Sequence, residues 1–221
     1  MGNMMYIKTA LVTTAIFAVG VLLGMWMGEQ KVNELEQTLN VLKGNLEDTE
    51  LQFMFLDTMK SNISCSYLNR QASQLGTESD QLGKEVERYE ISQKIDETTF
   101  NALKKNYNIV LIRDWLTIEK IKQMCDAKYA TVLYFYSNKN CDKCQDQGIV
   151  LSYLKGKLKQ DIMIFALDSD LGVNIVDALK VSYDITSYPT LIINGEVHRG
   201  YSDLNQTTQI LCDYNSNFSI C

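Results

Sequence analysis

Proline is almost absent from this chain. Its 221 residues include a single proline, Pro189, whereas the average frequency of about 5% would give roughly eleven. Proline interrupts helices, so a chain nearly free of it can form long, continuous ones. The one proline that remains therefore needs an explanation of its own.

The composition excludes several functional classes. An apolar fraction of 46% is sufficient for a folded core. Lys and Arg number 21 against 27 Asp and Glu, for a net charge of −6, which predicts no binding of nucleic acid because phosphate contacts need clustered positive charge. A lone histidine, His198, leaves little basis for a histidine-ligated metal site or a Ser-His-Asp triad. We therefore expect neither a metal nor a nucleic-acid partner.

The amino-terminal region predicts a membrane anchor. After a short head at residues 1–8, residues 9–28 form a run of 20 without a charge, which as a helix would span about 30 Å, the thickness of a hydrocarbon core. Tyr6 and Trp26 flank or end the run as interfacial aromatic residues do. The alternative is a cleaved signal peptide, but no small-residue cleavage motif precedes Glu29. We interpret the run as an uncleaved signal anchor.

Sidedness and self-association can be read only indirectly. Lys8 and Lys31 balance the charge on the two sides of the run, so the positive-inside rule gives no clear orientation. A short head with a large carboxyl-terminal body, together with six cysteines, favours an extracytoplasmic body, where disulfides persist. Gly20, Gly24 and Gly28 share one helix face and would allow a homodimer through close helix packing, unless they are ordinary membrane-helix glycines.

Residues 30–126 have the pattern of a helical stalk. Apolar residues recur every three or four positions in two seams separated by a polar turn at 61–64, with Thr49 polar in the first seam and Ser79 in the second; this pattern predicts a coiled-coil hairpin. The seams are Val32, Leu35, Leu39, Leu42, Leu46, Phe53 and Leu56, then Leu68, Ala72, Leu75, Ser79, Leu82, Val86 and Tyr89. A third helix is predicted after 96–99, although residues 108–113 also fit a strand.

Equal spacing about a chain reversal pairs two cysteines. If the chain turns near residue 95, Cys65 and Cys125 each lie 30 residues from the turn. In antiparallel helices equal offsets bring side chains to the same height, which predicts a Cys65–Cys125 disulfide between the stalk and the last domain. The alternative is two unrelated buried thiols.

Residues after 130 have the sequence pattern of an α/β domain that contains a Cys-x-x-Cys motif. A β-branched and aromatic run at 131–136 leads through a polar loop to Cys141 and Cys144, and a helical pattern follows. At the start of a helix Cys141 would gain thiolate character, while Cys144, one turn later, could resolve a mixed disulfide. The sequence also predicts a further strand (162–167), a helix (173–181) and a strand after Pro189. An Asn-Gly turn, a return strand at 197–201 and a last helix (202–213) follow.

Over residues 128–213 the chain resembles the thioredoxin superfamily. The matching elements are the strand 132–136, the motif Cys141 to Cys144, the triplet Tyr188-Pro189-Thr190, the turn Asn194-Gly195 and Gly200. The resemblance implies that Pro189 follows a cis peptide bond, packs against the disulfide and, with Tyr188, shapes a groove for an extended substrate. It also implies a redox-active disulfide with no organic cofactor.

Three features depart from the thioredoxin pattern. Asp142 and Lys143 replace the usual Gly-Pro, with opposing effects on the pKa of Cys141. Phe135 stands where thioredoxins carry a buried aspartate linked to proton transfer, and Asn140 replaces the aromatic residue before the first cysteine. The redox potential of thioredoxins therefore cannot be assumed for this chain.

These patterns combine into one prediction. We expect a transmembrane helix, a coiled-coil stalk and, at 128–221, a thioredoxin-like α/β domain whose central mixed sheet is flanked by helices. Cys141 and Cys144 would exchange disulfides with cysteine-containing substrate proteins and a redox partner. The alternative functions are a zinc half-site, for which no second ligand pair is present, and a non-catalytic adaptor acting through its stalk. Cys212 and Cys221 would either close a small loop or stay unpaired.

Overall fold

The structure, a computed structural model, describes residues 11–23, 51, 54–55, 58, 64–92 and 97–221. The chain divides into two compact units, Met1–Gly44 and Asn45–Cys221. In the first unit residues 11–23 are helical with exposed side chains. The remainder of the predicted span at 9–28, with Gly24 and Gly28, lies outside the described residues. Across the described ranges, no helix is both long and apolar enough to cross a membrane.

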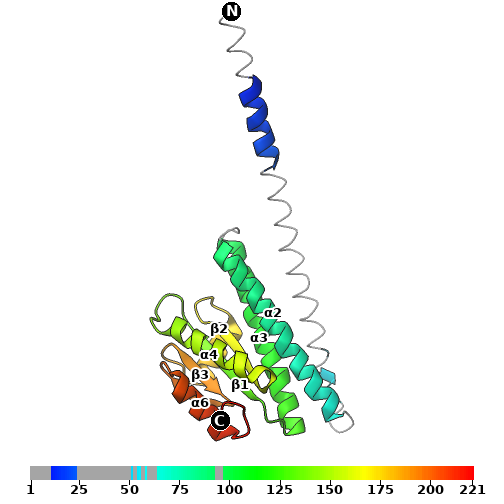
Figure 1. The fold of residues 1–221 in the computed structure, drawn as a ribbon, viewed down its shortest axis with the longest axis vertical. Coiled ribbons are helices and arrows are strands. Elements are labelled where there is room, and N and C mark those ends of the chain that lie inside the picture. Colours follow the sequence, from blue (N-terminus) through cyan, green and yellow to red (C-terminus); the bar gives the residue numbers. More distant parts are fainter. Residues whose placement is uncertain (1–10, 24–50, 52–53, 56–57, 59–63, 93–96) are drawn as a thin grey trace, which may run out of the picture. The chain divides into compact units, whose positions relative to one another are not determined.

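The second unit is built on a mixed four-stranded sheet with strand order β2-β1-β3-β4 (Figure 1). The strands are β1 (Ala130–Tyr136), β2 (Ile162–Asp168), β3 (Thr190–Ile193) and β4 (Glu196–Arg199). β1 and β2 are parallel, whereas β3 is antiparallel to both β1 and β4. Asn194 and Gly195 both have positive φ, 50° and 92°, and make the tight turn from β3 to β4 that the Asn-Gly pair predicts.

Helices cover both faces of this sheet (Figure 1). They are α2 (Cys65–Ser92), α3 (Glu97–Cys125), α4 (Cys144–Leu158), a short 3₁₀ turn η1 (Lys159–Asp161), α5 (Asn174–Ser182) and α6 (Leu204–Tyr214). Strand side chains alternate between faces. Leu133 and Phe135 of β1 join the core beneath α2, α3 and α5, and Val132 and Tyr134 join the core beneath α4 and α6. The sheet is thus buried on both faces.

The predicted coiled-coil stalk is not seen in the described residues. The first seam lies largely outside them, and the second seam, in α2, packs on α3 and on the sheet. Leu68, Ala72 and Leu75 share one core with Leu111 of α3 and Phe165 of β2. The unit that contains the sheet accordingly begins at Asn45 and includes both helices. Apolar spacing at three and four residues marks a buried helix face, but it does not distinguish a partner helix from a partner sheet.

The strand alternative for residues 108–113 is wrong, because α3 is continuous from Glu97 to Cys125. Val110, Leu111 and Ile112 are all nearly inaccessible, since this part of the helix is covered on more than one side. Burial in a helix and burial in a strand both produce short apolar runs, so periodicity alone cannot separate them.

The reversal between α2 and α3 brings Cys65 and Cys125 together. The structure joins them in a disulfide with a Cα–Cα distance of 5.5 Å, the pair expected from equal offsets. Because the bond closes a loop of 60 residues, it restricts the unfolded chain strongly.

Replacing both cysteines by serine is expected to lower the free energy of unfolding by about 2–4 kcal/mol, since the unfolded chain regains the entropy of that loop. Chemical denaturation of the non-reduced protein would measure the change. The matched control is the double variant Cys212→Ser/Cys221→Ser, which opens a loop with a sequence separation of only 9 and is expected to lose less. A loss no larger than the control's would contradict a clamping role for Cys65–Cys125.

A buried carboxyl group lies between α2 and α3. Asp114 is 4% exposed and accepts a hydrogen bond from the Ser79 hydroxyl at 2.5 Å. The pKa of Asp114 is raised to about 7, chiefly by burial and to a smaller extent by Glu78, against the opposing effects of the Ser79 hydrogen bond and Arg113. The folded protein therefore binds this proton more tightly than the unfolded chain, and its stability must fall as the proton leaves.

The contribution of Asp114 to the free energy of unfolding is accordingly expected to be fully present below about pH 4 and to be lost, by a few kcal/mol, as pH rises through about 7. Asp114→Asn should remove most of this fall, because asparagine cannot ionise. Asp126→Asn, at an exposed turn with positive φ, should keep it. Thermal melts from pH 4 to 9 would separate the variants, and identical pH profiles for wild type and Asp114→Asn would refute the assignment.

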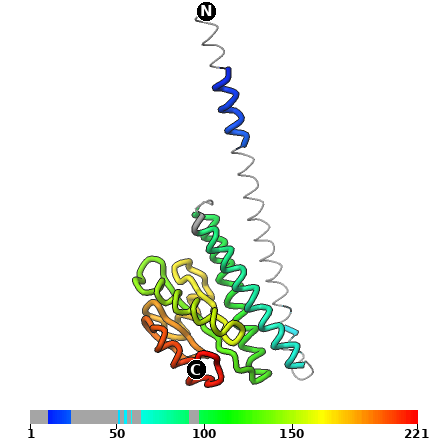
Figure 2. Tube along the Cα trace, in the orientation of Figure 1, coloured from blue at the N-terminus to red at the C-terminus, as the bar shows by residue number. Residues whose placement is uncertain are grey.

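The carboxyl-terminal tail folds back beside the start of β1 (Figure 2). Asn215 Nδ2 donates to the Lys128 carbonyl at 3.2 Å, and a Cys212–Cys221 disulfide with a Cα–Cα distance of 5.7 Å closes the tail. Of the two alternatives for these cysteines, the structure has the paired one.

Candidate functional site

The redox motif lies where β1 gives way to α4. Cys141 and Cys144 form a disulfide with a Cα–Cα distance of 5.5 Å. Cys144 is the first residue of α4 and only 6% exposed, whereas Cys141 is half-buried. The sequence predicted Cys141 itself at the helix start; instead Asp142 and Lys143 form a turn, and Cys141 precedes the helix. Of the two sulfurs, the one belonging to Cys141 is therefore the more accessible to a partner.

The charge of Lys143 is shared with other groups. Its Nζ lies 2.8 Å from an Asp146 carboxylate oxygen one turn along the helix and 5.6 Å from the centre of the Tyr201 ring. The hydrogen bond to Asp146 raises the pKa of Lys143, so this residue stays cationic. Part of its positive charge is neutralised by Asp146, so less of that charge is available to stabilise a thiolate at Cys141.

Pro189 and Tyr188 stand at the entrance to β3. The Tyr188–Pro189 peptide bond is cis, as the resemblance implies, and the Pro189 carbonyl accepts a hydrogen bond from Gly200 N–H at 2.8 Å. Tyr188 and Cys141 both pack at the margin of the core beneath α4 and α6. The structure thus brings Tyr188, one of the two predicted groove residues, and both cysteines of the motif to the same hydrophobic cluster.

The loop before Cys141 is held by Asp170. One of its carboxylate oxygens accepts from Asn138 N–H at 2.8 Å, and both accept from the Ser137 hydroxyl, at 3.0 and 3.1 Å. In turn, Ser137 Oγ accepts from the backbone N–H groups of Lys139 and Asn140, each at 3.1 Å. The backbone N–H groups of Asn138, Lys139 and Asn140 are therefore all satisfied within the loop and its Asp170 anchor, which limits the positions open to Cys141.

A buried ion pair lies behind that loop. Lys104 Nζ of α3 is 2.6 Å from Asp168 Oδ2 at the end of β2, and the two side chains are only 8% and 2% exposed. Asp168 also accepts from Asn138 Nδ2 and from Asp170 N–H, both at 2.9 Å. The pair therefore connects α3 to the loop that carries Cys141.

Two further side chains support the start of α4. The Tyr134 hydroxyl donates to the Cys144 carbonyl at 2.6 Å, and burial raises the pKa of Tyr134, which stays neutral. Gln147 is fully buried, and its Oε1 accepts from Ser202 N–H at 2.8 Å. Phe135, which stands where thioredoxins carry a buried aspartate, belongs to the core on the other face of the sheet. This position therefore supplies no carboxylate for proton transfer.

Sequence reasoning missed most of these supporting residues. Asp168 and Asp170 flank a serine directly after a predicted strand, a signal that could have marked the pair. Nothing in the sequence distinguishes Lys104 or Gln147 from other polar residues on a helix. Within the described residues no three His, Cys, Asp or Glu side chains are placed to hold a metal ion.

Taken together, this geometry defines a thioredoxin-like fold. A parallel β1–β2 pair, an antiparallel β3–β4 extension, a Cys-x-x-Cys motif at the start of α4 and a cis-proline before β3 occur in the order of the superfamily. The added α2 and α3 cover one face of the sheet.

Solved structures similar to this one include several thioredoxins. Thioredoxin O2 from Arabidopsis thaliana, in its oxidised state, is 20% identical, with 40% of this chain and 76% of that one covered and a TM-score of 0.33. Fasciola hepatica thioredoxin is 14% identical, with 46% and 94% covered and a TM-score of 0.35. Chloroplastic thioredoxin z is 14% identical, with 43% of this chain and 87% of that one covered and a TM-score of 0.36. No family model and no curated protein matches the chain.

Proposed function

We propose that this chain is a membrane-anchored thiol-disulfide oxidoreductase that exchanges disulfides with cysteine-containing proteins. The observation that supports this proposal is the asymmetry of the motif. Cys141 precedes α4 and is partly accessible to solvent, whereas Cys144 is the first residue of α4 and is buried. An accessible sulfur that meets the partner and a shielded one that resolves the complex are what a two-step exchange requires.

The exchange transfers two electrons in two substitutions at sulfur. In the dithiol form, the Cys141 thiolate attacks a substrate disulfide; a Cys141–substrate bond forms as the substrate bond breaks, and one substrate thiolate leaves and takes up a proton. Cys144 then attacks Cys141 as its thiolate, which restores the Cys141–Cys144 disulfide and releases the second substrate thiolate. The same steps reversed oxidise a substrate dithiol.

Turnover by the full-length chain in detergent would test the proposal. We expect dithiothreitol-driven reduction of insulin and a single reversible two-electron transition of Cys141–Cys144 against glutathione buffers. The measured potential would assign the protein as an oxidant or a reductant. Absence of turnover, with a disulfide that does not equilibrate with glutathione, would overturn the proposal and favour the non-catalytic adaptor.

The location is proposed from residues 9–28 and from the six cysteines. We place the domain on the extracytoplasmic side, where its three disulfides would persist. Carbonate extraction should leave the chain in the membrane fraction, and protease added to intact cells should digest the domain. Full protection from protease would contradict the extracytoplasmic location of the domain, but it would not contradict the proposed disulfide exchange.

A further inference from the structure

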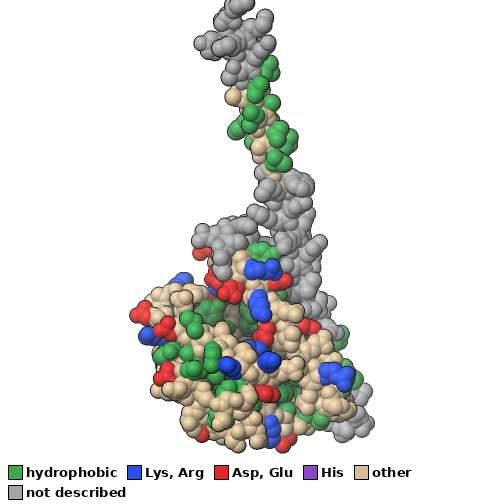
Figure 3. Space-filling model, in the orientation of Figure 1, with side chains coloured by type: hydrophobic (Ala, Val, Ile, Leu, Met, Phe, Trp, Pro, Cys, Tyr) green, Lys and Arg blue, Asp and Glu red, His purple; other side chains and the backbone are tan. Residues whose placement is uncertain are grey.

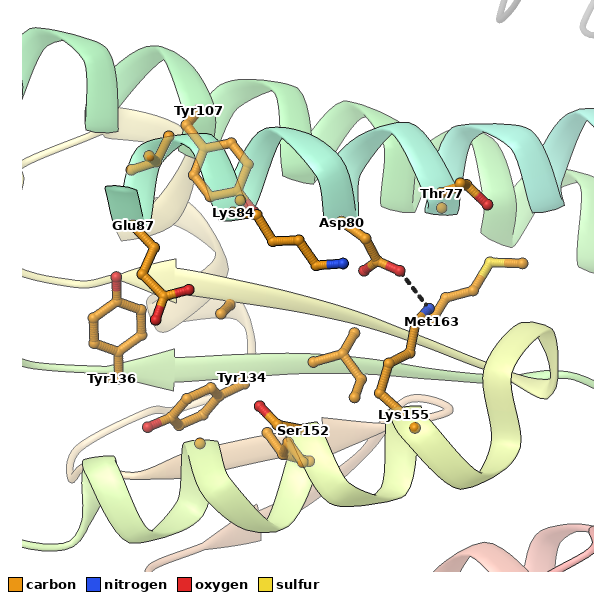
Figure 4. A pocket seen from close by; sticks show the side chains of 18 of the residues that line it. Thr77, Asp80, Lys84, Glu87, Tyr107, Tyr134, Tyr136, Ser152, Lys155 and Met163 are labelled. Atoms are coloured by element: carbon orange, nitrogen blue, oxygen red, sulfur yellow. Dashed lines mark ion pairs between the residues drawn. The ribbon is translucent and has the colours of Figure 1, made fainter. Parts of the chain in front are cut away.

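A second candidate binding site lies between α2 and α4. There a cleft of about 720 Å³ opens over the outer edge of β2. Figure 4 shows side chains from both helices pointing into it, among them Asp80 and Lys84 from α2 and Ser152 and Lys155 from α4. Its volume is in the range of pockets that hold small ligands or a few residues of a peptide. The redox motif itself does not line it.

The floor of this cleft is the unpaired edge of a sheet. β2 is the outermost strand of the described sheet, paired only with β1. Beyond its end, Ser169 N–H donates to the Tyr136 carbonyl of β1 at 2.9 Å. Main-chain groups alternate in direction along a strand, so odd-numbered residues of β2 face β1. The N–H and C=O groups of Ile162, Ile164, Ala166 and Asp168 consequently face the cleft.

Side chains already occupy the two ends of this edge. At one end Lys155 Nζ donates to the Ile162 carbonyl at 3.0 Å. At the other, the Asn108 carboxamide donates to the Asp168 carbonyl at 2.9 Å and accepts from Asp168 N–H at 3.4 Å. Asn108 therefore binds the strand as a peptide group of a neighbouring strand would. Between these ends, no residue of the described ranges is seen to pair with the main chain of Ile164 or Ala166.

We propose that this cleft binds an extended peptide segment of a partner protein, which adds to β2 as a short strand. The ligand chemistry follows from the floor: Ile164 and Ala166 each present one donor and one acceptor, and a secondary amide chain complements both, as Asn108 does at Asp168. Addition to an exposed edge is an established mode of peptide recognition. This site is independent of the redox role proposed for Cys141.

The charges of the cleft favour an uncharged segment. Lys155 is paired with Asp80 at 2.9 Å across the cleft, and Lys104 with Asp168. Glu87 and Lys84 also line it with opposite charge. Positive and negative side chains are likewise interspersed on the face seen in Figure 3. Over the whole lining, four lysines face three carboxylates (Lys84, Lys104, Lys155 and Lys159 against Asp80, Glu87 and Glu90). With charge so nearly balanced, selectivity must come from main-chain pairing and from shape.

Glycines on α4 leave the cleft open. At both Gly148 and Gly156 an added Cβ would meet no atom within 4 Å, and both residues line the cleft. Gly156→Leu should therefore fill the space without displacing the fold, and leucine is also the better helix former. The adjacent Lys157 is exposed and does not line the cleft, so Lys157→Leu adds the same side chain outside it.

Amide hydrogen exchange of the full-length chain, resolved by residue, would test the proposal. The probe is an acetylated and amidated pentapeptide of alternating valine and threonine. Without it, the amides of Ile164 and Ala166 should exchange at least about tenfold faster than those of Met163 and Phe165, which face β1. Saturating peptide should slow Ile164 and Ala166 by about tenfold or more. The slowing should vanish in Gly156→Leu and persist in Lys157→Leu.

An N-methylated version of the peptide separates strand addition from apolar capture. It keeps the side chains but lacks the donors, so it should give no protection. Equal protection by both peptides would overturn the proposal, as would no protection by either. Slow exchange of Ile164 and Ala166 before any peptide is added would also overturn it, since the edge would then be covered by this chain or by a second copy. None of these results depends on whether Cys141 is active.

Discussion

Replacing Cys141 by serine is expected to abolish disulfide exchange, with a loss of at least about a hundredfold in the rate of insulin reduction. Cys141 carries the accessible sulfur of the motif, and a hydroxyl at that position cannot form a mixed disulfide. Cys144, buried as the first residue of α4, cannot take over its role. A Cys141→Ser variant that retains the wild-type rate would refute the assignment of the attacking residue.

Cys144→Ser should behave differently. The first substitution can still occur at Cys141, but the thiolate that resolves the complex is missing, so a covalent complex with the substrate should accumulate. Non-reducing electrophoresis, with release of the complex by dithiothreitol, would detect it. The double variant Cys212→Ser/Cys221→Ser is the matched control: it removes a disulfide beside β1 and should trap nothing. Equal trapping by Cys141→Ser and Cys144→Ser would contradict the proposed division of roles.

The elements of the α/β domain were predictable because each has a strong local cause. Short continuous apolar runs, rich in β-branched and aromatic residues in β1, mark β1 and β2. The Asn194-Gly195 pair sets the turn between β3 and β4 because both positions need positive φ. The last helix begins with a capping box between Asp203 and Gln206, which a search for N-cap residues can find. Such signals lie within a few residues of the structure they specify.

The association of α2 and α3 with the sheet had no such local cause. Leu68 and Leu75 recur at helical spacing whether they meet a helix or Phe165 of β2. The same limit applies to the site. Cys141, Cys144 and Pro189 are found from spacing and resemblance, whereas Lys104 reaches Asp168 from 64 positions away. Only the packing of α3 on β2 brings those two charges together.

The Lys104–Asp168 pair yields the largest expected effect on stability. Lys104→Met should lower the free energy of unfolding by about 3–5 kcal/mol, because it leaves the Asp168 carboxylate buried without a cation. Asp168 is 2% exposed, and its hydrogen bonds to Asn138 and Asp170 cannot replace a full positive charge. Denaturant unfolding at pH 7 would measure the loss.

A second variant distinguishes an uncompensated charge from simple loss of packing. In Lys104→Met/Asp168→Asn the buried site is neutral, so much of the lost stability should return. Arg88→Met, which breaks an exposed pair with Glu85 at 3.4 Å, should cost less than about 1 kcal/mol. If the double variant is as unstable as Lys104→Met, the cost arises from packing rather than charge.

Because Asp168 also binds the loop before Cys141 through Asn138, the neutral double variant should fold yet show a changed equilibrium of Cys141–Cys144 with glutathione.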